Sequence, residues 1–177
     1  MKNRITELVT VVDFFVFYQL LQGDRAIHLS FAEQEHREAA DRLQNMTCQI
    51  NQLPERKMTA GELADMLTRQ WSFAEFSQSI FIQAGTPFQQ RVWELISRIP
   101  YGETRTYGQL AQALGNKMLA RAVGQACGAN PIALLIPCHR VVGHTGLGGF
   151  GGGIDLKKKL LALEKKQIPA TSRQILR

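Results

Sequence analysis

The chain has 177 residues, of which 45% are hydrophobic and 20% charged, with three cysteines and a net charge of +6. This composition excludes an intrinsically disordered chain and a small disulfide-stapled fold, because it supplies enough apolar side chains for a core and only three cysteines. We expect one ordinary domain or two small ones, in an intracellular, reducing compartment with free thiols.

The charge is distributed unevenly along the chain. Residues 1–84 carry 8 Lys and Arg against 11 Asp and Glu, whereas residues 85–177 carry 13 against 4. A basic C-terminal half favours a polyanionic partner for that half. A solvated lysine face is the alternative interpretation of the segment DLKKKLLALEKK, residues 155–166.

The N-terminal half predicts a small sheet with helices. β-branched and aromatic residues from 10 to 21 predict one strand, the turn signal QGDR follows, and residues 25–31 predict its hairpin partner. Residues 32–46 and 63–71 predict two helices. The apolar part of this half is too short for a membrane span and lacks a cleavage site, so we expect no membrane or targeting segment.

The segment GTPFQQRVW predicts the entrance to a second domain and the start of a helix. Thr86 suits the helix cap, Pro87 the first helical position, and Gln89 completes a capping box. We therefore expect an α/β (α+β) fold. It comprises a sheet-containing domain over 1–84, a mainly helical domain over 85–170, and a tail over 171–177.

Two further helices predict a helix-turn-helix. TYGQLAQALG, residues 106–115, predicts a short helix closed by its final glycine, and LARAVGQACGAN, residues 119–130, predicts the next helix. Small residues dominate the second helix, while Arg121 and Gln125 share one face. This pattern indicates either close backbone approach to a partner or close helix–helix packing.

The stretch IALLIPCHRVVG, residues 132–143, places a cysteine beside a histidine at the end of an apolar run. A base near Cys138 would generate the nucleophilic thiolate. Neighbours on an extended strand point to opposite faces, so His139 would need a sharp bend after Pro137, or a bridging water, to act on the thiol. A carboxylate should orient the imidazole, and Glu164 is a candidate. With such a base we expect the thiol pKa to lie below about 8.5.

Other interpretations of these cysteines are open from the residues alone. Cys138 could be a core residue, and Cys127 reads more readily as a small buried hydrophobe than as a reactive thiol. A metal site would need a second Cys or His pair at ligand spacing, which the sequence does not offer. A papain-like protease would carry a local signature that is missing here.

The motif IPCHRVVG resembles the active site of the O6-alkylguanine-DNA alkyltransferases (methylated-DNA–protein-cysteine methyltransferases). The similarity continues through GTPFQQRVW, IPYGETRTYGQLAQALG, ARAVGQACGANP and LLALE, in that order. It covers the C-terminal half, whereas the N-terminal half is similar only in its pattern of a hairpin and helices.

The resemblance implies chemical roles for five residues. Cys138 would accept the alkyl group, His139 would deprotonate it through a water, and Glu164 would hold His139. Asn130 would stabilise the turn beside the site. Tyr107 would donate a proton to the departing guanine.

The resemblance also implies DNA contacts and a pocket. Arg121 would enter the base stack in place of the flipped nucleotide, and small residues of its helix would line the minor groove. The other implied DNA contacts are Ala122, Gln125, Arg140 and Thr106. The implied pocket residues are Phe150, Gly151, Gly152, Val141 and Pro137. Here Phe150 stands in place of the family's tyrosine, which keeps the aromatic wall but loses the hydroxyl. Gly151 stands in place of the family's small residue and leaves more room in the pocket.

The function implied is direct DNA repair. A single-turnover transferase would move a methyl or other alkyl group irreversibly from O6 of a flipped guanine to Cys138, without cofactor or metal. O4-alkylthymine is a second substrate that the sequence leaves open. The expected partner is double-stranded DNA carrying the lesion, bound by a monomer in the cytoplasm, or in the nucleus of a eukaryote.

Three rivals differ from this function in class. A non-catalytic lesion-binding relative would lack the acceptor cysteine, which this chain keeps. A transcriptional regulator would need several base-reading side chains on its recognition helix, where this chain offers chiefly Arg121 and Gln125. An unrelated thiol enzyme is the third.

Overall fold

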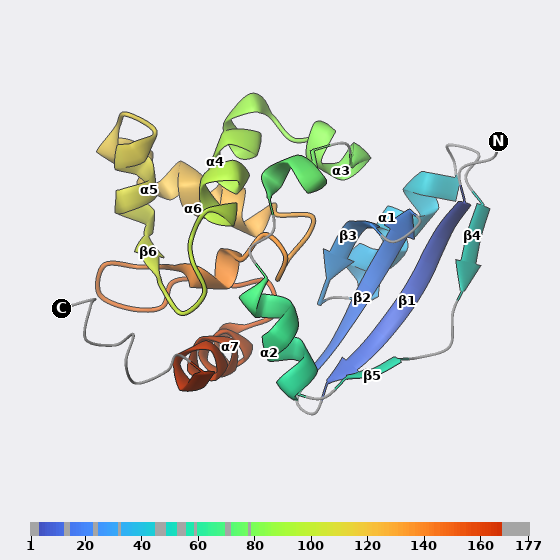
Figure 1. Cartoon of the computed structure of the whole chain (residues 1–177). Coiled ribbons are helices and arrows are strands. Elements are labelled where there is room, and N and C mark those ends of the chain that lie inside the picture. Colours follow the sequence, from blue (N-terminus) through green and yellow to red (C-terminus); the bar gives the residue numbers. More distant parts are fainter. Residues whose placement is uncertain are drawn as a thin grey trace.

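The N-terminal half of the molecule contains the small sheet that the sequence predicts, and this sheet is mixed (Figure 1). The computed structural model describes residues 4–12, 15–22, 25–31, 33–44, 49–52, 56–58, 60–69, 72–77 and 79–167. The strands are β1 (Arg4–Val12), β2 (Phe15–Gln22), β3 (Arg25–Ser30), β4 (Gln49–Gln52) and β5 (Arg56–Met58). They lie in the order β3-β2-β1-β4, and β5 also pairs with β1. β2 pairs antiparallel with both β1 and β3, whereas β4 and β5 run parallel to β1.

The single strand predicted over residues 10–21 is wrong. β1 ends at Val12 and β2 begins at Phe15, and these two residues face each other in an antiparallel pair. β-branched and aromatic residues continue from one strand into the next, so composition does not mark the strand end. The hairpin of β2 and β3 is confirmed.

The described helices are α1 (Glu33–Gln44), α2 (Ala60–Thr68), α3 (Ile80–Gln83), α4 (Pro87–Ser97), α5 (Tyr107–Ala113), α6 (Ala120–Gly128) and α7 (Ile154–Gln167). α1 confirms the helix predicted over 32–46 and packs its buried Ala39 and Ala40 with Ile5 and Leu20 of the sheet. α2 begins before the segment predicted over 63–71 and ends at Thr68.

Capping boxes start two of the C-terminal helices. In α4 the Thr86 hydroxyl accepts from the Gln89 N–H and the Gln89 side chain accepts from the Thr86 N–H, as predicted. The same arrangement starts α5 at Thr106. Gly115, just after α5, has φ +93°, a conformation that favours glycine. A short 3-10 turn, Lys117–Leu119, joins α5 to α6 and completes the helix-turn-helix.

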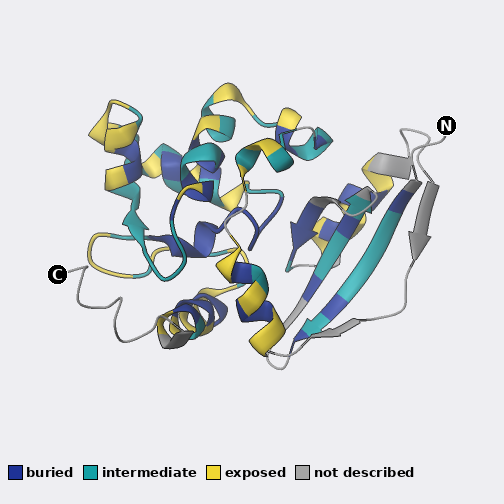
Figure 2. Cartoon of the chain, in the orientation of Figure 1, coloured by how far each residue is buried: buried dark blue, intermediate teal, exposed yellow. Residues whose placement is uncertain are grey.

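The two halves of the chain share one core. The Leu29 N–H of β3 donates to Pro131 O at 2.9 Å, and the Ala133 N–H donates to Leu29 O at 3.3 Å. Leu29 also belongs to a buried cluster that includes Trp93 and Ile132. Figure 2 shows buried residues of the helices toward the middle of the molecule and exposed residues on their outer turns. Within the described residues, no helix is both long and apolar enough to cross a membrane.

Candidate active site

Cys138 lies on a tight turn instead of a strand. Residues Cys138–Arg140 form a 3-10 helix that follows Pro137, with the Cys138 N–H donating to Ile136 O at 2.8 Å and the Arg140 N–H to Pro137 O at 2.9 Å. Of the two arrangements predicted from the sequence, the sharp bend after Pro137 is therefore present. The thiol is free, and Cys138 is only 7% exposed.

His139 is fully buried and held by Glu164 of α7. Its Nε2 lies 2.7 Å from Glu164 Oε1, and neither side chain is exposed. A carboxylate only accepts, so Nε2 carries the proton in this contact and Nδ1 keeps its lone pair. Nδ1 is buried and has no hydrogen-bond partner among the described residues. Burial lowers the pKa of His139 despite the opposing effect of Glu164, so the imidazole is neutral and can accept a proton.

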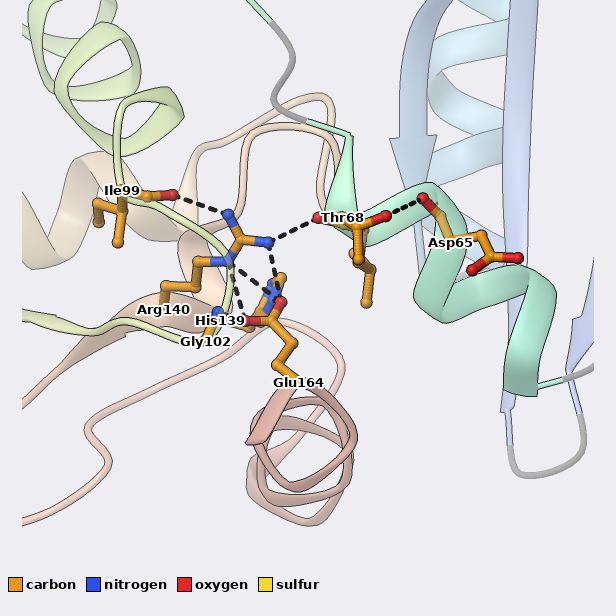
Figure 3. A network of polar contacts seen from close by, with 8 residues as sticks. Asp65, Thr68, Ile99, Gly102, His139, Arg140 and Glu164 are labelled. Atoms are coloured by element: carbon orange, nitrogen blue, oxygen red, sulfur yellow. Dashed lines mark hydrogen bonds and ion pairs between the residues drawn. The ribbon is translucent and has the colours of Figure 1, made fainter. Parts of the chain in front are cut away.

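The carboxylate of Glu164 is the centre of a buried polar network (Figure 3). Arg140 donates to it from Nε and Nη2 at 3.0–3.1 Å, and the Gly102 N–H donates to Oε2 at 2.9 Å. Burial alone raises the pKa of Glu164, but the hydrogen bonds and charges of His139 and Arg140 outweigh it and lower the pKa. Glu164 therefore stays ionised and fixes the tautomer of His139.

Arg140 is not at the surface. Its side chain is 6% exposed, and it also donates to Ile99 O at 2.8 Å and to Leu67 O of α2 at 3.0 Å. This argues against the predicted role of Arg140 in DNA binding, because its donors already serve the interior. Arg140 instead neutralises Glu164 and ties the site to the N-terminal half.

Asn130 braces the turn that carries the cysteine. Its Nδ2 donates to Ile136 O at 2.8 Å, and its Oδ1 accepts from the Ile132 N–H at 3.1 Å. Burial raises the pKa of Cys138, and a hydrogen bond from Asn130 and the nearby charge of Lys157 offset this only in part. The expectation of a lowered thiol pKa is therefore wrong. The thiol keeps its proton until a base removes it.

Lys157 is a site residue that sequence reasoning missed. It is fully buried, and its Nζ donates to the carbonyls of Val141, Leu147 and Gly149. It thereby holds the loop after the cysteine against α7. The signal was its seven-residue spacing from Glu164, which places both on one helical face. The alternative interpretation of this segment as a solvated lysine face is therefore wrong for Lys157, whereas Lys158 and Lys159 are exposed.

A cavity of about 470 Å³ opens onto the cysteine, within the size range of ligand pockets. It lies between α6 and the loop that follows Cys138. Its lining is Tyr107, Ala120, Arg121, Gly124, Gln125, Cys127, Gly128, Cys138, Gly149, Phe150 and Gly151. The structure thus brings the predicted acceptor, proton donor, base-stack residue and aromatic wall together around one space.

The other predicted pocket residues lie outside this lining. A Cβ on Gly152 would meet Leu156 at 2.6 Å, so this glycine allows close packing behind the loop. Val141 is buried in strand β7 (Val141–Val142), which pairs with β6 (Arg105–Thr106). Pro137 is buried at the start of the cysteine turn. These residues support the pocket without lining it.

Tyr107 stands at the first position of α5, where its ring faces the loop. A Cβ on Gly148 would come within 2.6 Å of the Tyr107 hydroxyl, and Gly148 has φ +68°, so only glycine suits this position. Burial raises the pKa of Tyr107, and the two nearby thiols raise it further. The phenol is therefore protonated and able to donate.

The predicted DNA contacts divide between surface and structural positions. Arg121 and Gln125 are exposed on α6 and belong to the lining of the cavity. Ala122 is partly buried beside them, and Thr106 caps α5. Among the described residues, no group of three or more His, Cys, Asp or Glu side chains could hold a metal ion.

Comparison with known proteins gives a consistent match. Residues 87–166 match the model of the "6-O-methylguanine DNA methyltransferase, DNA binding domain". The methylated-DNA–protein-cysteine methyltransferase of Mycobacterium tuberculosis is 59% identical over 87 residues, which cover 49% of this chain and 53% of that protein. The chain thus spans about half the length of the curated relatives it matches.

Solved structures extend the likeness over both halves of the chain. The crystal structure of M. tuberculosis O6-methylguanine methyltransferase has a TM-score of 0.65 and 29% identity, over 97% of this chain and 99% of that one. A crystal structure of M. tuberculosis OGT in complex with DNA has a TM-score of 0.61 and 32% identity, over 93% and 96%. The mixed α/β fold predicted from the sequence is confirmed.

Proposed function

Because the chain belongs to the O6-methylguanine DNA methyltransferase family, we propose that it repairs O6-alkylguanine in DNA by moving the alkyl group onto its own Cys138. One observation carries this proposal. Cys138 lines a cavity, and the adjacent histidine is neutral and bound to a carboxylate through Nε2, with no partner at Nδ1 within the described part of the chain. This is the arrangement of a nucleophile with an oriented general base.

The first step is removal of the thiol proton. His139 Nδ1 takes it through a water, and Glu164 stabilises the imidazolium that forms. Negative charge develops on the Cys138 sulfur in this step. The Asn130 hydrogen bond and the buried Lys157 ammonium stabilise that charge and so favour the thiolate. The high pKa of the resting thiol keeps Cys138 unreactive until this step.

Transfer follows when the thiolate attacks the alkyl carbon. The S–C bond forms as the C–O6 bond breaks, and the bonding electrons pass to the guanine. Tyr107 donates a proton to the departing base. The thioether is not hydrolysed, so each molecule acts once and needs no cofactor.

DNA reaches the site through the helix-turn-helix. The alkylated oxygen lies inside the duplex, so the base must flip out to meet the thiol. The small residues of α6 permit close approach in the minor groove, and Arg121 fills the vacated stack. The partner is double-stranded DNA carrying O6-alkylguanine, with O4-alkylthymine as a further candidate substrate. The protein acts as a monomer in the cytoplasm, or in the nucleus of a eukaryote.

A single-turnover assay tests the proposal. Incubation with a duplex carrying O6-methylguanine should leave one added methyl on the peptide that holds Cys138, as read by mass spectrometry. Cys138→Ala should abolish transfer and retain DNA binding, because the thiol makes no phosphate contact. A methyl on Cys48 or Cys127 instead would contradict the assignment.

The same samples separate the rival functions. Binding through phosphates should weaken steeply with salt, whereas a regulator would prefer one specific sequence. A lesion binder would retain the damaged DNA without any methylated peptide.

A further inference from the structure

A second thiol lines the same cavity as the acceptor, and the proposed repair reaction does not use it. Cys127, in the last turn of α6, is free and partly buried. Both Cys127 and Cys138 contribute to the cavity lining. Residues 127 and 138 thus approach one space from two different elements.

The electrostatics place these thiols near each other. Cys138 raises the pKa of Cys127, and the buried Lys157 ammonium lowers the pKa of both thiols. Burial is the largest cause of the high pKa of Cys127, which is about 12. The three groups therefore form one cluster, and neither thiol is a resting thiolate.

The last turn of α6 is open to solvent beside Gly128. A Cβ on Gly128 would meet no atom within 4 Å, and Gly128 is exposed. Disulfides require Cα atoms about 4.4–6.8 Å apart. A disulfide therefore requires the turn of Cys127 and the turn of Cys138 to bring their Cα atoms within this range.

We propose that Cys127 is the resolving thiol of a reversible disulfide with Cys138, formed when a peroxide enters the cavity. The inference rests on the proposed function only in its use of His139 as the base for Cys138. The disulfide blocks alkyl acceptance, so the acceptor is stored in a recoverable form under oxidation.

The chemistry balances in two steps. Deprotonated Cys138 attacks hydrogen peroxide, the O–O bond breaks, and the sulfenic acid forms while the thiol proton leaves with hydroxide as water. Cys127 then attacks the Cys138 sulfur, the S–O bond breaks, and a second water departs with the Cys127 proton. Two thiols lose two electrons and one peroxide becomes two waters. A small thiol reductant reverses the bond by exchange.

Without a resolving thiol the sulfenic acid would persist. Further peroxide would carry it to sulfinic acid, which ordinary thiol reductants do not reverse. Cys127 therefore protects a nucleophile that the protein can use only once.

Peptide mapping of the full chain tests the proposal. Trypsin releases both cysteines in one peptide, residues 122–140, because no Lys or Arg lies between Arg121 and Arg140. After hydrogen peroxide treatment this peptide should be two hydrogens lighter and resistant to iodoacetamide until dithiothreitol is added. Methyl transfer should be lost on oxidation and restored by dithiothreitol.

Cys127→Ala is the decisive variant. Its transfer activity before oxidation is its own reference, and it should not return to that activity after peroxide and reductant, whereas the parent returns to its own starting activity. The matched control Cys48→Ala should behave as the parent does. Three results would each overturn the proposal. The oxidised parent could carry only sulfenic or sulfinic acid at Cys138, a disulfide could join Cys138 to Cys48, or Cys127→Ala could recover fully. The peptide readout needs no alkylated DNA, so absent transfer in untreated parent protein would contradict the proposed function alone.

Discussion

Replacing Glu164 with glutamine tests how the active site is held together. The carboxylate is buried and accepts from His139, Arg140 and the Gly102 N–H. Glutamine keeps one accepting oxygen but puts an amide donor against groups that are themselves donors. The Arg140 charge then has no counterion in the interior.

The structure sets the size of the expected loss of stability and of the expected loss of transfer rate. Breaking a buried ion pair by removing one partner costs about 3–5 kcal/mol. For a chain of this length that corresponds to a fall in Tm of roughly 6–20 °C. His139 also loses the anion that fixes its tautomer, so we expect transfer to slow by about 10²-fold or more.

The assay compares Glu164→Gln with a variant of the same chemistry at the surface. Glu94 pairs with Arg98 on α4 at 2.6 Å, and both side chains are substantially exposed. Glu94→Gln should therefore change stability by less than about 1 kcal/mol and leave transfer unchanged. The measurements are thermal unfolding, second-order transfer rate at a temperature where both variants are folded, and affinity for unmodified duplex. A folded Glu164→Gln that transfers at the parent rate would refute the positioning role, and an unchanged Tm would refute the ion-pair argument.

Three further predictions follow from other parts of the structure. Gly151 lines the cavity, and a Cβ there meets no atom within 4 Å. Gly151→Ser should therefore leave the rate of methyl transfer unchanged and slow transfer from O6-benzylguanine. An unchanged or higher rate with O6-benzylguanine would show that the glycine serves backbone geometry alone. Arg121→Ala should reduce transfer from duplex DNA more than it reduces binding and should spare transfer from free O6-benzylguanine, whereas equal losses of transfer and binding would make Arg121 a backbone clamp. Burial and the neighbouring His36 lower the pKa of His28 from 6.5 to about 4, so about 3 kcal/mol of stability should be present above pH 6.5 and lost as pH falls toward 4. Urea unfolding across that range should show this slope, and His28→Phe should flatten it; an equal slope in the variant would assign the acid sensitivity elsewhere.

Local signals in the sequence were sufficient for much of the fold. The capping box at Thr86, the glycine after α5 and the helix-turn-helix follow from short-range backbone preferences, which need no distant partner. The strand end at Val12 could not be predicted, because β-branched and aromatic residues continue on both sides of it and pairing across the sheet decides the boundary.

The sequence by itself predicted a nucleophile at Cys138 with a base at His139, since the two residues are neighbours, and it gave the bend after Pro137 as one of two arrangements. Tertiary structure alone decided three further properties of the site. It buried Arg140 against Glu164, folded Lys157 inward, and raised the pKa of the Cys138 thiol. These three properties depend on the loss of solvent around a side chain and on charges that separate elements bring together. A residue's neighbours in the chain fix neither the burial of its side chain nor the charges around it.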